Sequence, residues 1–475
     1  MDIKIFLDKV CNEIRYKPVR KEIAEELENH IDELKEIYIE KGFHENQAEE
    51  KAIEQMGKAE EIGKKLNKIH KPKLDWKLLI LIIILIGYGV TISILKQSLN
   101  NTYIQNTIIH IVIGSILGII IYFLDYRKIK KYSNLIYILA TIIMILPFIG
   151  VRNYFNGIPY MNVFGIGFFP SMITLPLYIL SFIGVIVDYN DKMKIYNKKE
   201  KTINKDFIKL ILMAIFSLLL FIKTNSTANA MILAITYIII TTIKIIQVNK
   251  NKLRNLLILY GSIIIVPIIL LTITFGEIPT NLNKGAFRFN RILVSFSPEI
   301  DPQGAGYTGM LQKEILENAK LIGETQTDVI SNEQFIINQD SNFTFIYLLG
   351  KTGIIPAVTL VITIILTSIK LIINAKNIKE QYGKYIIIGL SSIYIIQSLA
   401  SVLMNINLGI KTNIDLPFVT YGGVYFIVNI ISISIILSVY RRKDINVYDK
   451  NNVGIIGKIG EVLLDLDKKI NNVSN

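Results

Sequence analysis

The chain has 475 residues, of which 51% are hydrophobic, and its mean hydropathy is +0.43. Soluble proteins of this length are less apolar, so the composition excludes an ordinary soluble enzyme. The net charge is +13, but residues 1–75 hold 15 Lys and Arg against 18 Asp and Glu, which leaves +16 for the remainder. A basic excess in the apolar part is typical of cytoplasmic loops and not of nucleic-acid binding, so no nucleic-acid partner is expected.

Residues 1–71 are predicted to form a small cytosolic helical bundle. Apolar side chains recur at steps of four and three between Val19 and Tyr38, which is the spacing of one helix face. Asn46 and Glu49 are spaced like a capping box at the start of the next helix. The stretch "ELENHIDELKEIYIEKGFHENQAEEKAIEQMGKAEEIGKKL" resembles the prefix domain that precedes some bacterial permeases and sensors. This resemblance implies an interaction module with a cytosolic partner, joined by the linker 72–76 to the rest of the chain.

About ten apolar segments are long enough to cross a bilayer as helices, and they predict an all-α polytopic membrane domain over residues 77–445. They lie near 77–95, 105–124, 133–151, 170–187, 207–222, 228–247, 254–275, 343–373, 384–404 and 420–440. Lys and Arg are concentrated in every second loop, beginning with the loop after the second segment. Because such loops face the cytosol, the pattern predicts a multi-pass plasma-membrane protein with both termini in the cytosol.

The segment at about 276–341, between the seventh and eighth predicted spans, is then external. It holds nine acids and five bases, and its centre is "SPEIDPQGAGY", Ser297 to Tyr307. A loop of this length is usually either functional or disordered, and its apolar positions favour partial order. The tail 446–475 has apolar residues at helical spacing, which predicts an amphipathic helix that lies on the membrane surface or binds a partner.

Several classes of site are not supported by the sequence. There is one cysteine, Cys11, and the four histidines are scattered, so no metal-ligand set is expected. The chain has no phosphate-binding loop, no HExxH and no dinucleotide fingerprint. Ionisable residues are nearly absent from the predicted spans, which disfavours ion-coupled transport.

Three segments resemble the FtsW/RodA/SpoVE family, the SEDS proteins of bacterial cell-wall synthesis. "RILVSFSPEIDPQGAGY", Arg291 to Tyr307, is similar to the start of the family's large external loop. "DLPFVTYGG", Asp415 to Gly423, is similar to the family's LPF-[IV]-SYGG motif before the last span. "NG…FGIGFFPS", Asn156 to Ser171, is similar to the region between the family's third and fourth spans. The resemblance covers about residues 77–445.

The resemblance implies a peptidoglycan glycosyltransferase that polymerises glycan strands from lipid II, the undecaprenyl-linked precursor, with a class B penicillin-binding protein as partner. Such a reaction needs a base for the attacking sugar hydroxyl and polar or cationic groups for the departing pyrophosphate. No cofactor is expected, and a divalent cation at the pyrophosphate is left open.

The family's presumed catalytic aspartate aligns with Asn342, in "IINQDSNFTF". A carboxamide cannot take up a proton as a base. Asp340, two residues upstream, is the alternative, although it could equally cap the start of the eighth span. Other charged family positions fall at Pro159, Tyr160, Met172 and near Ser226, which indicates that the ancestral chemistry is altered or lost.

Other polar residues stand where the family has them or lie on short external loops. The substrate-binding candidates are Arg291, Glu299, Asp301, Gln303, Tyr307, Lys223, Lys411 and Tyr421. For Arg291 and Asp301, pairing within the loop is as reasonable as substrate contact. Lys223 and Lys411 could meet a pyrophosphate or only extend to the membrane interface. Three functions follow: a lipid II polymerase, a non-catalytic binding or regulatory homologue, and a flippase for the lipid-linked precursor.

Overall fold

The computed structural model describes residues 2–69, 71–96, 102–149, 153–155, 158–163, 166–195, 205–247, 253–254, 257–264, 292–326, 342–420 and 423–443. They divide into two compact units, the first holding the helices before residue 75 and the second holding residues 75–439. The predicted tail helix at 446–475 and most of the predicted span at 254–275 lie outside the described residues.

The first unit consists of four helices. They are α1 (Ile3–Glu13), α2 (Lys17–Glu40), α3 (Glu45–Met56) and α4 (Ala59–Ile69). The predicted apolar stripe of α2 is its buried face, on which Val19, Ile23, Leu27 and Ile31 join the core of the unit. The predicted capping box is wrong, because the N-cap of α3 is His44, two residues before Asn46, and it makes no side-chain cap hydrogen bond.

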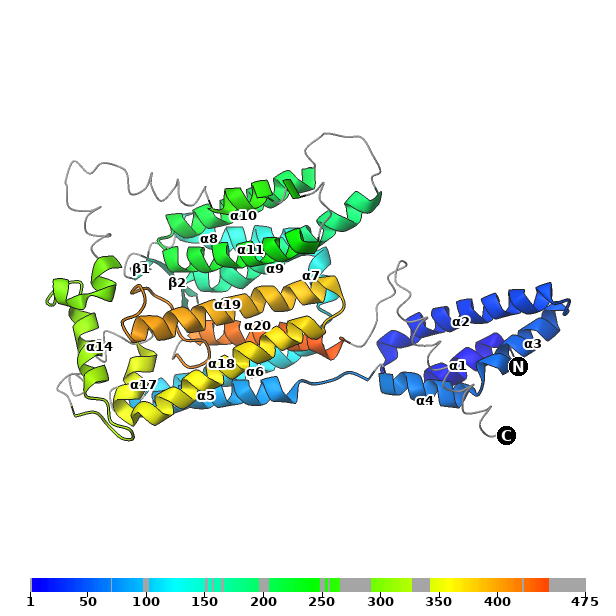
Figure 1. Ribbon diagram of the computed structural model, residues 1–475, viewed down its shortest axis with the longest axis horizontal. Coiled ribbons are helices and arrows are strands. Elements are labelled where there is room, and N and C mark those ends of the chain that lie inside the picture. The colour runs from blue at the N-terminus through cyan, green and yellow to red at the C-terminus, as the bar shows by residue number, and fades with distance from the viewer. Residues whose placement is uncertain are drawn as a thin grey trace. The chain divides into compact units, whose positions relative to one another are not determined.

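The second unit is a bundle of membrane-length helices (Figure 1). Among the described residues, seven helices are long and apolar enough to cross a membrane. The helix α8 (Ser133–Ile149) is apolar but shorter. The seven are α5 (Trp76–Lys96), α6 (Thr102–Phe123), α9 (Pro170–Ile195), α11 (Thr227–Gln247), α18 (Ile354–Asn377), α19 (Gln381–Asn405) and α20 (Gly423–Arg441). The helix α10 (Lys205–Lys223) coincides with the predicted span at 207–222. The helical class is therefore confirmed.

The core of this unit lies around α9 and α19. In the most apolar stretch of α9, 78% of the residues are buried inside the protein. In the corresponding stretch of α6 only 11% are buried, so α6 is a peripheral helix. The largest fully buried side chains include Tyr178, Phe182, Tyr237 and Tyr385. An exposed apolar helix such as α6 is expected where the surrounding solvent is lipid.

The predicted span at 343–373 is not one helix. It is divided at Gly353 into α17 (Thr344–Thr352) and α18. Gly353 has a φ of +96°, a conformation that side chains disfavour, and Pro356 in the first turn of α18 supplies no backbone donor. The apolar run continues across this break, so hydropathy alone did not reveal it.

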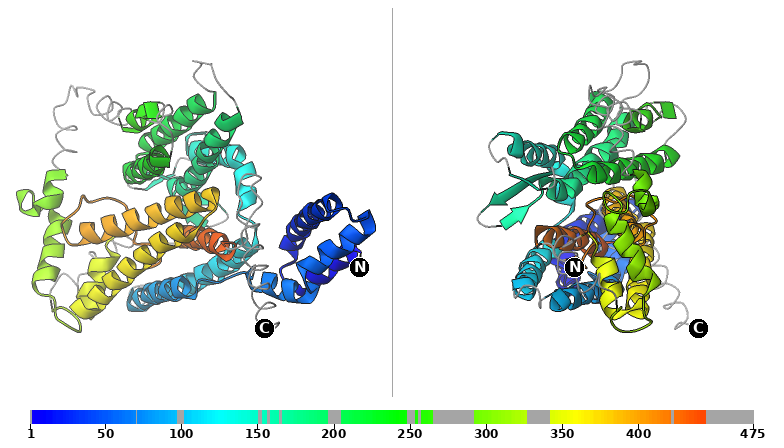
Figure 2. Two further views of the ribbon diagram at one scale, coloured as in Figure 1. Left: turned by 45° about the vertical axis from the view of Figure 1, so that its right-hand side comes forward. Right: turned by 90° about the vertical axis from the view of Figure 1, so that its left-hand side faces the viewer.

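A three-stranded antiparallel sheet follows α8, in a region with no predicted strands. Its strands are β1 (Asn153–Phe155), β2 (Ile158–Val163) and β3 (Ile166–Phe168), in the order β1-β2-β3. The register pairs Asn153 with Tyr160 and Met161 with Phe168. The strands project to one side of the helices (Figure 2).

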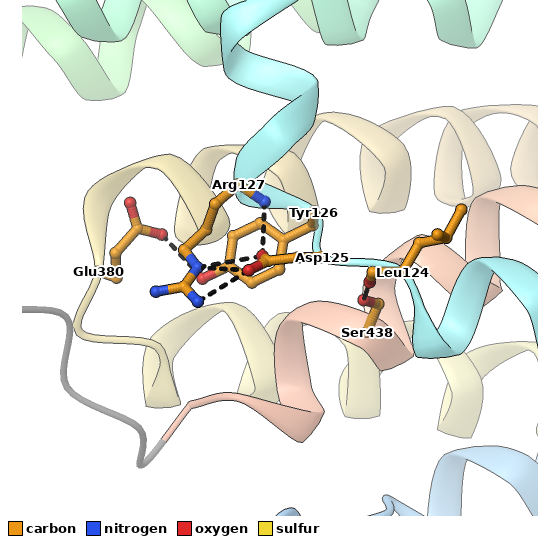
Figure 3. Close-up of polar contacts among 6 residues, drawn as sticks. All are labelled: Leu124, Asp125, Tyr126, Arg127, Glu380 and Ser438. Atoms are coloured by element: carbon orange, nitrogen blue, oxygen red, sulfur yellow. Dashed lines mark hydrogen bonds and ion pairs between the residues drawn. The ribbon is translucent and has the colours of Figure 1, made fainter. Parts of the chain in front are cut away.

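Polar contacts connect three segments at the end of the bundle that holds α7 (Arg127–Lys131), which we call the α7 end (Figure 3). The Tyr126 hydroxyl donates to Glu380 Oε2 at 3.1 Å, and Ser438 Oγ donates to the Leu124 carbonyl at 2.7 Å. Glu380 also caps α19 by accepting from the backbone N–H groups of Tyr382 and Gly383. Nearby, the buried Asp75 carboxylate accepts from Asn374 Nδ2 at 2.7 Å and pairs with Lys370 Nζ at 3.0 Å. These contacts fix the α7 ends of α5, α18, α19 and α20.

Candidate functional site at the α14 end

The described parts of two segments that resemble family motifs, 297–307 and 415–420, lie at the opposite end of the bundle, which we call the α14 end (Figure 1). It contains the turn from Ser297 to Gly306 with the short 3-10 helix η1 (Pro298–Ile300), the helix α14 (Tyr307–Glu317), the start of α17, and the loop 406–420 that follows α19. The turn and α14 are consecutive in the sequence, whereas the start of α17 and the loop 406–420 are distant from them and from each other, and side-chain hydrogen bonds join α14, α17 and this loop. The site was therefore assembled by folding and not by one local motif.

The "SPEIDPQGAGY" turn is held by its own contacts. The Asp301 carboxylate accepts from the Ala305 backbone N–H at 2.8 Å, and the Asp301 carbonyl accepts from the Gly306 N–H at 2.9 Å. A Cβ at Gly306 would lie 2.1 Å from the Pro298 carbonyl oxygen, so this close approach requires glycine. For Asp301 the alternatives were pairing within the loop and contact with substrate. The structure contains the pairing within the loop.

Glu299 lies on the surface of the same turn. Its Oε1 is 2.6 Å from Lys313 Nζ on α14, and this hydrogen-bonded ion pair lowers the pKa of the Glu299 carboxyl. Gln303 and Tyr307 are also exposed. The three side chains therefore present polar groups to the solvent around α14.

Asn342 occupies the last turn before α17 and belongs to a set of amide contacts. Asn342 Nδ2 donates to Asn413 Oδ1 at 3.2 Å. The fully buried Asn405 donates from Nδ2 to the Asn342 carbonyl at 3.0 Å and accepts from the Ile346 N–H at 3.0 Å. Asn405 thus fixes both sides of the start of α17. The position that is predicted to match the family's aspartate is therefore held by these contacts, and its side chain is an amide.

Lys411 connects α14, the end of α19 and the loop 406–420. Its ammonium donates to Gln312 Oε1 on α14, to Asn407 Oδ1 at 2.5 Å and to the Met404 carbonyl at 3.1 Å. It also lies 5.7 Å from the centre of the Phe343 ring. Burial lowers the pKa of Lys411 to about 8. An ammonium has three donors, and all three have a protein acceptor here, so this geometry suits a positioning role more than a pyrophosphate contact.

Asn407 reinforces the same connection. Its φ is +58°, and its Nδ2 donates to the Gly309 carbonyl of α14 at 2.9 Å. Asparagine tolerates this left-handed conformation better than most residues. Gln312, Asn405, Asn407 and Asn413 were not predicted from the sequence as site residues. Three asparagines within nine residues at the end of an apolar span were the available signal.

Asp415 is a buried carboxylate in the loop 406–420, and only 5% of it is exposed. The Tyr425 hydroxyl of α20 lies 3.1 Å from the Asp415 carbonyl oxygen and 3.0 Å from Gln397 Oε1, two acceptors for its one hydrogen. Asp415 begins the "DLPFVTYGG" motif but was not predicted as a site residue. An acid directly before "LPF" in a short loop was the signal for it.

Four predicted site residues remain: three that the structure does not describe, and Lys223. Arg291, Asp340 and Tyr421 lie outside the described residues. Lys223 is exposed at the C-terminal end of α10, and none of the described hydrogen bonds or ion pairs connects it to the α14 end. Within the described ranges, no group of three or more His, Cys, Asp and Glu could hold a metal ion. The divalent cation stays a prediction.

A small pocket lies between α5, α6 and the loop 406–420. Its polar lining comes from Ser93, Thr107, His110 and Thr420, and Phe418 and Phe426 supply aromatic rings. It has room for about one water molecule. A sugar attached to a lipid does not fit into it, so the α14 end is the better candidate for a substrate surface.

Comparison with known proteins agrees with this architecture. The family model of the FtsW/RodA/SpoVE cell cycle proteins matches residues 73–445. A probable peptidoglycan glycosyltransferase FtsW from Nitrosomonas europaea is 23% identical over 390 residues, which cover 78% of this chain and 94% of that protein. The corresponding protein of Enterococcus hirae is 24% identical over 155 residues, which cover 33% of this chain and 39% of that protein.

Solved structures with the same fold include a chain from a peptidoglycan synthase complex that coordinates polymerization and crosslinking. Its TM-score is 0.57 at 16% identity, covering 78% of this chain and 98% of that chain. A mutant of the rod shape determining protein RodA from Thermus thermophilus has a TM-score of 0.53 at 12% identity, with the same two coverages of 78% and 98%. This chain is a multi-pass membrane protein, and it belongs to the FtsW/RodA/SpoVE family.

Proposed function

We propose that this protein acts in bacterial cell-wall synthesis and binds lipid II with its α14 end at the outer face of the membrane. The observation that carries the proposal is the convergence of α14, the start of α17 and the loop 406–420 on one surface. The Asn342–Asn413, Asn407–Gly309 and Lys411–Gln312 hydrogen bonds join them there. Exposed polar groups at Glu299, Gln303 and Tyr307 surround this cluster and suit the hydroxyls and amides of a disaccharide-peptide.

Lipid II polymerisation is the reaction implied by the similarity to FtsW proteins. It requires a base at the attacking hydroxyl, and the amide of Asn342 does not supply one. The second candidate function is therefore a non-catalytic homologue that binds lipid II and regulates a synthase. This candidate is favoured by one observation, the amide contacts that hold Asn342 where the family has its aspartate.

A class B penicillin-binding protein is the proposed partner, with both chain termini in the cytosol. The support is the fold shared with a chain of a peptidoglycan synthase complex, together with the basic loops at the α7 end. A cytosolic partner of the first unit is part of the same proposal.

The test is a pair of measurements on purified full-length protein, alone and with a class B penicillin-binding protein. Lipid II binding is measured by fluorescence titration, and polymerisation by the appearance of glycan strands. Asn342→Asp and Asp340→Ala are compared with Asn377→Asp, which makes the same amide-to-acid change on the exposed α7 end of α18.

Saturable lipid II binding by the wild type supports the proposed function, and absence of binding overturns it. Strands from the wild type that disappear in Asp340→Ala assign the base to Asp340. Strands from Asn342→Asp but not from the wild type or Asn377→Asp identify a binding homologue whose scaffold still supports catalysis.

A further inference from the structure

The chain directly after α14 exposes two neighbouring apolar side chains beside the start of a membrane-length helix. Leu321 is 69% exposed and Ile322 is 71% exposed. We propose that both side chains insert among the phospholipid acyl chains of the leaflet at the α14 end, and that they anchor α14 to the membrane surface. The proposal goes beyond the proposed function and does not depend on it, because its ligand is the bilayer and no substrate is involved.

Backbone hydrogen bonds fix this pair beside the first turn of α18. The Ile354 N–H donates to the Lys320 carbonyl at 2.9 Å, and the Ile355 N–H donates to the Leu321 carbonyl at 3.1 Å. The segment that follows α14 therefore returns to the start of α18 (Figure 1). Leu321 lies at the level of Ile355, and main-chain bonds hold it there.

The break between α17 and α18 has backbone groups that are satisfied by protein. The carbonyls of Gly350 and Thr352, at the end of α17, accept from the N–H groups of Thr325 and Gly323 at 2.8 and 3.0 Å. Pro356, in the first turn of α18, has no N–H to satisfy. Non-helical backbone at hydrocarbon depth is tolerated only where protein or a water-filled cavity supplies its hydrogen-bond partners. The hydrogen bonding of the break therefore meets the requirement for insertion to this level.

The pair extends the lipid-facing surface of α18. One face of this helix carries apolar side chains that are 43–51% exposed: Ile355, Val358, Ile362, Ile365, Leu366, Ile369, Ile372 and Ile373. From Ile355 to Ile373 a helix rises about 27 Å, slightly less than the roughly 30 Å thickness of the hydrocarbon layer. The whole face is therefore needed to cross the layer, and the edge of the layer at the α14 end lies at the level of Ile355 and Leu321.

The charged groups beside the pair suit the headgroup region of a bilayer. Lys320 is exposed, and its ammonium makes none of the hydrogen bonds or ion pairs found among the described residues. The carboxylate of Glu324 is paired with Lys351 of α17, so a neighbouring cation offsets its charge. A lysine beside inserted apolar residues can extend its stem along them and place its ammonium among the lipid phosphates. Inserted apolar side chains with a cation next to them are typical of a surface that lies in the membrane interface.

The alternative occupant of this surface is a protein, either a class B penicillin-binding protein or a second copy of this chain. A protein covers the pair only while it is bound, whereas lipid covers the pair in a single chain within a bilayer. Continuity with the lipid-facing side of α18 favours lipid. Because the Leu321 backbone is bonded to α18, a reporter side chain placed here stays at the level of the native one.

The experiment measures the depth of single tryptophans in full-length protein. Trp76 is the single native tryptophan, so Trp76→Phe provides a background without tryptophan fluorescence. Leu321→Trp and Ile322→Trp are reconstituted with a single chain per nanodisc of phosphatidylcholine and phosphatidylglycerol. Fluorescence quenching is measured with phosphatidylcholine that is brominated near the headgroup (the shallow label) or near the methyl end of its acyl chains (the deep label).

Two matched variants calibrate the depth. Gln303→Trp replaces an exposed residue of the turn before α14, and Ile365→Trp replaces a lipid-facing residue about 15 Å along α18 from Ile355. We expect the shallow label to quench Leu321→Trp and Ile322→Trp at least about threefold more than Gln303→Trp, and more than the deep label does. Ile365→Trp should be quenched more strongly by the deep label.

Each outcome decides the inference. Quenching of both reporters that is no stronger than that of Gln303→Trp overturns the proposal, because the pair then faces water. Quenching that is lost when a class B penicillin-binding protein or a second copy of the chain is added also overturns it, and assigns the surface to that protein. Quenching that is retained in the presence of both supports insertion. None of these results requires lipid II, so this inference and the proposed function can fail independently.

Discussion

At Lys411 one side chain connects three segments. Its ammonium reaches α14, the end of α19 and the loop that follows α19, and its backbone N–H donates to Ser295 Oγ at 3.1 Å. A half-buried ammonium is stable in such a place because its hydrogen bonds to the protein replace the hydrogen bonds to water that it loses on folding. Lys411 therefore contributes mainly to the position of α14, on which the polar surface of the site depends.

Replacement of Lys411 by methionine should destabilise the protein by roughly 1–3 kcal/mol, because three oxygen acceptors lose their donor. The control is Lys313→Met, which removes an exposed ion pair and should cost less than about 1 kcal/mol. Thermal unfolding in detergent compares the two variants. Equal effects of both variants would show that Lys411 is not a structural connection.

Glu26 is a second residue to discuss at this scale, because its surroundings change the pKa of its carboxyl. It is 4% exposed in the first unit, and neither carboxyl oxygen has a hydrogen-bond partner in the described part of the chain. Burial raises its pKa from 4.5 to about 7. Between pH 4.5 and about 7, Glu26 therefore keeps a proton in the folded state that it has released in the unfolded state.

The stability of the first unit should fall as the pH rises from about 4.5 to 7 and should stay low above that range. Glu26→Gln should remove this decline and be more stable than the wild type above pH 7 by roughly 2 kcal/mol. The measurement is hydrogen exchange of α2 in the full chain as a function of pH. Glu25→Gln, an exposed neighbour, should keep the decline, and a flat wild-type profile would contradict the prediction.

At the scale of elements, the break between α17 and α18 separates the site from the membrane-length helix. Gly353 sits against other backbone, because a Cβ there would lie 2.8 Å from the Ile322 Cα and 2.8 Å from the Leu321 carbonyl oxygen. The N–H of Ile354 donates to the Lys320 carbonyl at 2.9 Å. The segment after α14 thus packs on the break, and α17 stays directed toward Asn405.

Gly353→Ala should destabilise the protein by about 2 kcal/mol or more, since both the φ of +96° and the close backbone contact oppose a side chain. Gly87→Ala in α5 is the matched control, because nothing lies within 4 Å of its Cβ position and alanine favours helix. The control should be neutral or slightly stabilising. Unfolding temperatures of the two variants test the difference, and a neutral Gly353→Ala would mean that the break can adapt.

At the scale of the whole molecule, the membrane orientation is still a prediction. Cys11 is the single native cysteine, so Cys11→Ser provides a background for labelling introduced cysteines in intact cells. We expect Lys128→Cys and Lys379→Cys, exposed at the α7 end, to be protected from an impermeant reagent. Lys223→Cys and Gln303→Cys should react with it. Labelling of the first pair and protection of the second would show that the orientation is opposite to the predicted one.

The sequence by itself determined the class of the protein and its family. Apolar runs of membrane length appear directly in the residue order, because a helix in lipid satisfies its own backbone hydrogen bonds and needs no distant partner. The motif at 297–307 was likewise readable, because its turn is held by contacts within about ten residues. The match of Asn342 to the family's presumed catalytic aspartate was also drawn from the sequence, and it stays a prediction.

The tertiary structure decided what depends on contacts between distant segments. Hydropathy could not reveal the division at Gly353, because both sides of it are apolar and the cause is packing by residues 320–322. The sheet at 153–168 also escaped prediction, since its strands are only three to six residues long. The role of Lys411 and the burial of Asp415 depend on where α14 and α20 come to lie. Side-chain hydrogen bonds across about 100 residues, such as that from Lys411 to Gln312, exist only after the helices have packed.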